Sequence, residues 1–152
     1  MMRLPKNVQE QFRRFGRQGG LVRAQRLSSD ERKGIARRGA VRRWIRERFG
    51  DSSFRALGLP GGDIVDVGID DLTAGTETIE SLVVSLAAPR LRREGIPVPA
   101  SNFPEPERRL YRLLCETERE AAHSRYLAYL RRVSSFAHAC SSVRRNRGRR
   151  AE

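Results

Sequence analysis

Arginine and lysine are concentrated in the first fifty residues of this chain, and the chemistry they offer is the binding of anions. Residues 1–50 carry 15 Lys and Arg against 4 Asp and Glu, and the whole chain of 152 residues has a formal net charge of +13. This uneven distribution of positive charge indicates a polyanion partner, with nucleic acid the first candidate and an anionic membrane or an acidic protein as the alternatives. The candidate phosphate-binding residues are Arg13, Arg14, Arg17, Arg23, Arg26, Lys33, Arg37, Arg38, Arg42, Arg43 and Arg46.

Residues of catalytic or metal-binding type are few, and their spacing predicts no enzyme. Cys115 and Cys140 are the only cysteines and have no clustered histidines beside them, so we expect reduced thiols, no metal and no cofactor. Arg132 and His138 are spaced as in the Arg-x(4–6)-His motif of the HEPN ribonucleases, which are also all-α. That resemblance leaves ribonuclease chemistry as an alternative to a surface or capping histidine. Residues 16–20, GRQGG, lack the Lys-Ser/Thr of a nucleotide-binding loop.

Two helices joined by a short turn are predicted to position the basic residues. Ser28 and Glu31 have the spacing of a capping box, which predicts a helix from this point to about Arg48, before Gly50. Residues 7–26 contain no proline and are rich in Gln and Arg, so we expect a first helix there. The sequence therefore predicts a basic helical hairpin over residues 1–50.

Three glycines between residues 16 and 20 interrupt this first helix, and each should cost about 1 kcal/mol relative to alanine. If the turn centres on Ser28, facing positions of the hairpin place Gly20 opposite Ala36 and Phe12 opposite Trp44. Small residues at such a crossing let two backbones approach closely, and the contact offsets the lost helix propensity. The alternative is a helix that breaks at the glycines and leaves a loop.

The rest of the chain reads as a linker, a bundle and a tail. Residues 51–75 are predicted to be a linker, in which the short β-branched run 64–69 is an extended loop. Apolar residues at helical spacing predict a small helical bundle over 76–142. A proline-rich connector at 97–106 interrupts that bundle, and the Arg-rich residues 143–152 are predicted to be disordered.

Charge and hydropathy set the expected location and partners. The excess of cations at both ends contrasts with residues 51–100, where 8 acidic residues outnumber 4 basic ones. No stretch has the roughly 18 apolar residues of a membrane span, and the N-terminus lacks the apolar run of a signal peptide. We therefore expect a cytoplasmic protein with no membrane partner, in which nucleic acid binds to the basic ends.

A longer stretch resembles a pattern known from bacteria. Residues 15–44, FGRQGGLVRAQRLSSDERKGIARRGAVRRW, are similar to a GRxGG…L(S/T)xEERxxIARxxAxxRW pattern found in small basic proteins of plasmids and mobile elements. Residues 71–99 and the RYLAYLRRVSSF segment at 125–136 resemble the antitoxin-type partners encoded beside bacterial toxins. The first resemblance implies that the chain belongs to a plasmid or mobile element. The second implies that it has a partner protein.

From the residues and the resemblances together, the expected function is that of an antitoxin-like regulator. Its basic hairpin would bind nucleic acid, DNA in preference to RNA. Its bundle would bind a toxin or a second copy of itself. The alternatives are a sequence-independent DNA- or RNA-binding accessory protein of a mobile element, a HEPN-like ribonuclease, and an interaction protein with no affinity for nucleic acid.

Overall fold

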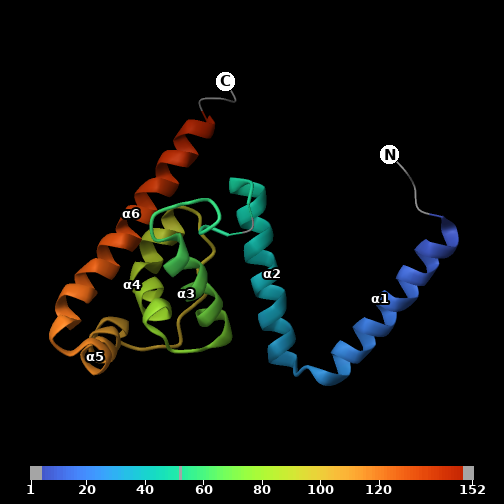
Figure 1. Cartoon of the computed structure of the whole chain (residues 1–152), viewed down its shortest axis with the longest axis horizontal. Helices are drawn as coiled ribbons and strands as arrows, with labels where there is room; N and C mark the ends of the chain where they lie inside the picture. The colour runs from blue at the N-terminus through green and yellow to red at the C-terminus, as the bar shows by residue number, and fades with distance from the viewer. Residues whose placement is uncertain (1–4, 52, 149–152) are drawn as a thin grey trace. The chain divides into compact units, whose positions relative to one another are not determined.

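The computed structural model describes the backbone of residues 5–51 and 53–148, with side chains for all of these except residues 6, 23, 24 and 144–148. This part of the chain is helical and contains no strand, which confirms the predicted all-α class. The elements drawn in Figure 1 are α1 (Lys6–Arg26), α2 (Ser29–Phe49), α3 (Gly62–Ala74), α4 (Ile79–Arg93), α5 (Pro106–Glu118), the 3-10 turn η1 (Arg119–Ala121) and α6 (Ala122–Gly148).

Contacts within the chain divide it into two compact units. The N-terminal unit is Met1–Ala36 and the C-terminal unit is Arg37–Glu152, so the boundary falls inside α2. In the N-terminal unit, the Ser28 backbone N–H donates to Glu31 Oε2 at 2.7 Å, and the Glu31 N–H donates to Ser28 Oγ at 3.2 Å. The first of these bonds is the main reason why the pKa of Glu31 is lowered. The predicted capping box at the start of α2 is therefore confirmed.

Helix α1 runs without a break through its three glycines, so the alternative of a loop at that point is wrong. A Cβ atom added to Gly16, Gly19 or Gly20 would meet nothing within 4 Å. Within the N-terminal unit, the predicted close crossing of Gly20 and Ala36 is therefore not formed. One methyl group facing a glycine buries little apolar area, which leaves little to hold two strongly basic helices together. The predicted contact between Phe12 and Trp44 would join the two units and stays a prediction.

The core of the C-terminal unit is built around α4, which packs against α3, α5 and α6. Edge-to-face aromatic contacts continue the core toward α2, with ring centroids 5.7 Å apart for Phe49 and Phe54 and 4.9 Å apart for Phe54 and Phe136. Ile45 of α2 is 2% exposed and belongs to the same core. The core therefore begins in α2, earlier in the chain than the apolar stripes of residues 76–142 indicate.

Helix α3 replaces the extended loop that the sequence predicts at residues 64–69. Its buried residues Ile64, Val65, Ile69 and Leu72 form one stripe at helical spacing, and burial of this stripe overrides the preference of β-branched residues for strands. At Gly68, α3 lies so close to α4 that an added Cβ atom would be 2.5 Å from the Glu80 carbonyl oxygen. The predicted linker thus supplies one of the central helices of the fold.

The C-terminal part follows the prediction as far as α6. The connector before α5 has no regular structure, and the Arg92 guanidinium fixes it by donating to the carbonyl oxygens of Val98 at 3.2 Å and Pro99 at 2.9 Å. Helix α6 continues to Gly148, six residues into the segment predicted to be disordered. The prediction is wrong for residues 143–148, and its last four residues lie outside the described part of the chain.

Candidate nucleic-acid interface

The predicted phosphate-binding residues of the N-terminal unit lie on exposed helix surface. At 100° per residue, Arg13, Arg14 and Arg17 fall within about 100° of one another around α1, and all three are exposed. Arg26 is exposed in the last turn of α1, and Arg23 lies in the same helix with its side chain outside the described part. In α2, Lys33 pairs with Asp30 at 3.3 Å, both strongly exposed. This ion pair is worth little in water, so Lys33 stays accessible to a stronger anion.

In the C-terminal unit, burial of Ile45 orients the basic residues of α2. Arg43 is exposed on the side of α2 away from the core, whereas the exposed Arg46 lines a pocket with Asp66 and Asp70 of α3. Arg37 is also exposed, whereas Arg38 is half-buried. The prediction of five equivalent cations over residues 37–46 therefore needs correction at Arg38, because its position in the helical repeat lies next to the buried stripe.

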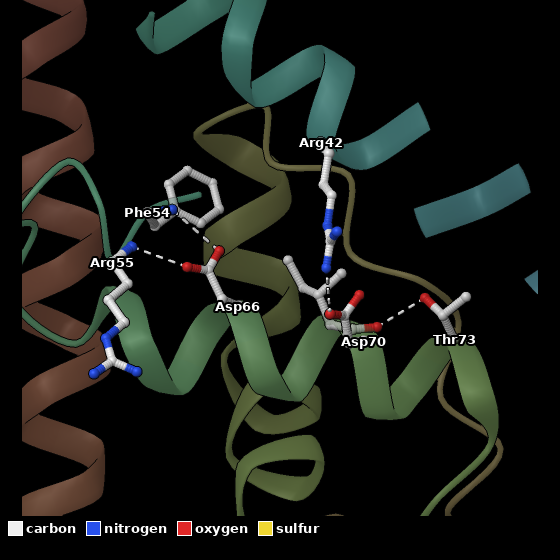
Figure 2. Close-up of polar contacts among 7 residues, drawn as sticks. Arg42, Phe54, Arg55, Asp66, Asp70 and Thr73 are labelled. Carbon is white, nitrogen blue, oxygen red and sulfur yellow. Dashed lines mark hydrogen bonds and ion pairs between the residues drawn. The ribbon is translucent and has the colours of Figure 1, made fainter. Parts of the chain in front are cut away.

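Arg42 differs from its neighbours because it already has an acidic partner. Its guanidinium lies 3.5 Å from Asp70 Oδ2 of α3, as Figure 2 shows. The two side chains are 64% and 40% exposed, so the pair contributes at most about 1 kcal/mol and can exchange for a phosphate. Among the described residues, the exposed Arg37, Arg43 and Arg46 form no ion pair.

Several arginines elsewhere in the C-terminal unit are engaged in internal contacts. Arg90 of α4 donates to Ser134 Oγ of α6 at 2.8 Å, and Arg109 of α5 pairs with Glu77. Arg92 holds the connector before α5, as described above. Other arginines of α4 to α6 are exposed and form no ion pair among the described residues; they are Arg93, Arg112 and Arg131. What distinguishes α1 and α2 is that their exposed cations lie close together along each helix.

Acidic side chains in the middle of the chain, residues 51–100, accept hydrogen bonds that stabilise the fold. On α3, Asp66 accepts hydrogen bonds from the backbone N–H groups of Phe54 at 3.1 Å and Arg55 at 2.9 Å, which fixes the turn after α2 (Figure 2). Burial raises the pKa of Asp66, and these two hydrogen bonds oppose only part of that effect. Asp71 accepts from the Thr78 hydroxyl at 2.7 Å, at the start of α4. Sequence reasoning recognised the negative charge but missed this role, because the partners lie 7 to 12 residues away along the chain.

The residues of the alternative ribonuclease site are not brought together. Arg132 donates from Nη2 to both Asp63 carboxylate oxygens at 2.8 Å, which links α6 to α3. His138 is exposed and lies six residues further along α6, about 120° around the helix from Arg132. Cys140 is buried, and burial raises its pKa to about 12, so its thiol stays protonated. In the described part of the chain, no three His, Cys, Asp or Glu residues cluster as metal ligands do.

Comparisons with known proteins add no function to this geometry. No family model, no curated protein and no solved structure matches the chain. Among the helices described, none is both long and apolar enough to cross a membrane.

Proposed function

We propose that this chain binds nucleic acid through its phosphates, with the exposed cations of α1 and α2 as the contact residues. The observation that carries the proposal is the concentration of exposed cations on two helices. Within the described residues, α1 and α2 each expose arginines that form no ion pair; they include Arg13, Arg14 and Arg17 on α1 and Arg37, Arg43 and Arg46 on α2. Several arginines of α4 to α6 are instead held by internal carboxylates, carbonyls or hydroxyls. Closely spaced cations on a helix repel one another, and phosphates relieve this repulsion.

The dimensions of α2 suit a phosphate backbone. Arg37 and Arg46 are nine residues apart, about 14 Å along the helix axis at 1.5 Å per residue. Duplex DNA presents roughly eight phosphates over that length, at one per about 1.7 Å. At 100° per residue, Arg37 and Arg46 lie on opposite sides of α2, whereas Arg43 and Arg46 lie about 60° apart. Arg43 and Arg46 can therefore contact neighbouring phosphates at once. Contacts of this kind carry no sequence information, so base specificity needs further residues.

The biological role that we propose is that of an antitoxin-like, DNA-binding regulator whose C-terminal unit binds a partner protein such as a toxin. This part rests on the resemblances of residues 15–44, 71–99 and 125–136 to mobile-element and antitoxin-type proteins. DNA is favoured over RNA on the same ground. The C-terminal unit would then carry both the phosphate-binding arginines at residues 37–46 of α2 and the surface for the partner protein.

The test is the salt dependence of binding to labelled duplex DNA, measured by fluorescence anisotropy. If about six cations meet phosphates, the logarithm of the affinity should fall against the logarithm of salt concentration with a slope near −5. The triple variant Arg37→Gln, Arg43→Gln, Arg46→Gln should make that slope less negative by about 3. The matched control is Arg93→Gln, Arg112→Gln, Arg131→Gln, which removes three exposed arginines from α4 to α6.

Two outcomes would contradict the proposal. Equal weakening by both triple variants would show that overall charge, and not the surface of α2, drives binding. Absence of binding at low salt to duplex and to single strands would remove nucleic acid as the partner. A labelled RNA in the same series tests the alternative of a ribonuclease. Cleavage of this RNA by the wild type but not by His138→Ala would show that the chain is an enzyme.

A further inference from the structure

Helix α1 carries an apolar face that phosphate binding does not use. Val8, Phe12, Phe15, Gly19 and Val22 recur at alternating steps of four and three residues, the spacing of a coiled-coil seam. The Phe12 and Phe15 side chains are 66% and 67% exposed, and Val22 is 45% exposed. Two phenylalanines presented to water on one side of a helix indicate a surface that another molecule covers.

The residues that border this seam are almost free of charge. They are Gln9, Gln11, Gly16, Gln18, Arg23 and Gln25. In a coiled coil these border positions lie opposite the other helix, where like charges repel. Arg13, Arg14 and Arg17 occupy the outer positions of α1 instead. A second helix with the same strongly basic composition can therefore approach the seam without facing a row of arginines.

Helix α1 also gains little stability from its own surroundings. Its three interior glycines lower its intrinsic helix propensity, and an added Cβ atom at any of them would meet nothing within 4 Å. Most of the stability of a helix in a protein comes from burial of an apolar face and not from intrinsic propensity. Burial of the seam is thus the interaction that α1 requires.

We propose that the apolar face of α1 pairs with the same face of a second copy of this chain. An antiparallel pairing in which facing residue numbers sum to 34 places Phe15 against Gly19 of the other copy and Phe12 against Val22. Large side chains then face small ones in these layers, and the two helix dipoles oppose each other favourably. At each end of the pairing, Val8 faces Arg26 of the other copy. Arg13, Arg14 and Arg17 of both copies stay on the outside, where they add to the cationic surface.

The expected dimer is weak. Four phenylalanine side chains of about 150–250 Å² each, two-thirds exposed, supply roughly 400–700 Å² of buried area. Stable interfaces bury about 1,200–2,000 Å², so this one should form and dissociate with protein concentration. Sedimentation equilibrium of the full chain, without nucleic acid and at a salt concentration that screens charge, is the direct measurement. We expect the mass to rise from monomer to dimer between low-micromolar and near-millimolar concentration, with a parallel gain of helical circular dichroism.

Matched variants locate the interface. Phe12→Gln with Phe15→Gln removes both rings without loss of helix propensity and should abolish the dimer over the whole concentration range. Leu21→Gln changes a residue that is 64% exposed on the same helix but outside the seam, and it should leave the dimer unchanged. Gly19→Leu should weaken the dimer because it fills the space opposite Phe15, whereas Gly20→Leu, outside the seam, should not.

Four results would overturn the proposal. The first is a wild-type protein that stays monomeric at every concentration. The second and third are a dimer that persists in the double variant, and a dimer that Leu21→Gln disrupts as strongly as the double variant does. The fourth is a monomeric protein in which the double variant destabilises the C-terminal unit. The last would show that the same chain covers this face. A tighter dimer in Gly19→Leu would overturn the antiparallel register. Because no nucleic acid is present, these results are independent of the proposed function.

Discussion

Helices α3 and α4 of the C-terminal unit approach each other closely at Gly68, and this contact gives a sharp test of the packing. A Cβ atom at this position would lie 2.5 Å from the Glu80 carbonyl oxygen, 2.5 Å from Val84 Cγ2 and 2.9 Å from the Glu80 carbonyl carbon. Cβ atoms essentially never approach other heavy atoms closer than 3.0 Å. Two of these three neighbours belong to the backbone of α4, which cannot rotate away as a side chain can. Gly68→Ala must therefore push α3 and α4 apart.

The expected free-energy change is the difference of two effects. Alanine in a helix interior gains about 1 kcal/mol over glycine through helix propensity. Overpacking of a tight core costs about 1–3 kcal/mol, and contact with backbone atoms favours the upper end. We expect Gly68→Ala to lower the free energy of unfolding by about 2 kcal/mol.

The assay is urea unfolding followed by the fluorescence of Trp44, the single tryptophan, which packs against the core. Gly39→Ala is the matched control, because Gly39 lies in α2 within the same unit and an added Cβ atom there meets nothing within 4 Å. That variant should be more stable than the wild type by up to about 1 kcal/mol. If Gly68→Ala were as stable as Gly39→Ala, the close packing of α3 on α4 described above would be wrong.

Three further predictions concern the same unit. Deletion of residues 1–36 should leave a protein that melts cooperatively. Deletion of residues 1–58 should abolish the melting transition, because part of the core lies in α2. The apolar stripes of the sequence alone would instead predict that this shorter protein still folds. Asp66→Ala should destabilise by about 1–3 kcal/mol through loss of its backbone hydrogen bonds. Burial raises the pKa of Asp66, so ionisation of Asp66 costs more in the folded than in the unfolded protein. The melting temperature of the wild type should therefore fall as pH rises through the pKa of Asp66, whereas that of Asp66→Asn should not show this fall. Iodoacetamide at mildly alkaline pH should label the exposed Cys115 in the folded protein, and Cys140, with its pKa raised to about 12, only after unfolding.

Local interactions were predictable from the sequence. The capping box of Ser28 and Glu31 involves residues three apart, so its geometry depends on little beyond the sequence itself. The start of α5 near Pro106 and the helical repeats of α4 to α6 follow equally from short-range spacing. The exposure of Arg43 and Arg46 follows from the same repeat, since Ile45 is the apolar residue beside them.

The features that depend on tertiary packing could not be predicted in this way. The run from Ile64 to Ile69 has the composition of a strand, and only its burial against α4 favours a helix. Sequence reasoning assigned the close helix crossing to Gly20, whereas the structure has such a crossing at Gly68. A glycine in a helical sequence shows that the position has no Cβ atom, but it does not show which other helix packs against that position. The pairing of Arg42 with Asp70 likewise joins residues 28 positions apart.

Two aspartates of α3 are held by hydrogen bonds from uncharged groups, and this separates two responses to salt. Asp66 accepts from the Phe54 N–H and Asp71 from the Thr78 hydroxyl, and dissolved ions screen such partly buried contacts poorly. Contacts between exposed arginines and phosphates are lost steeply as counterions accumulate. Under the proposed function, concentrated salt should therefore strip nucleic acid from the protein while the C-terminal unit keeps its fold. A high-salt wash followed by dialysis should then yield folded protein that binds nucleic acid again.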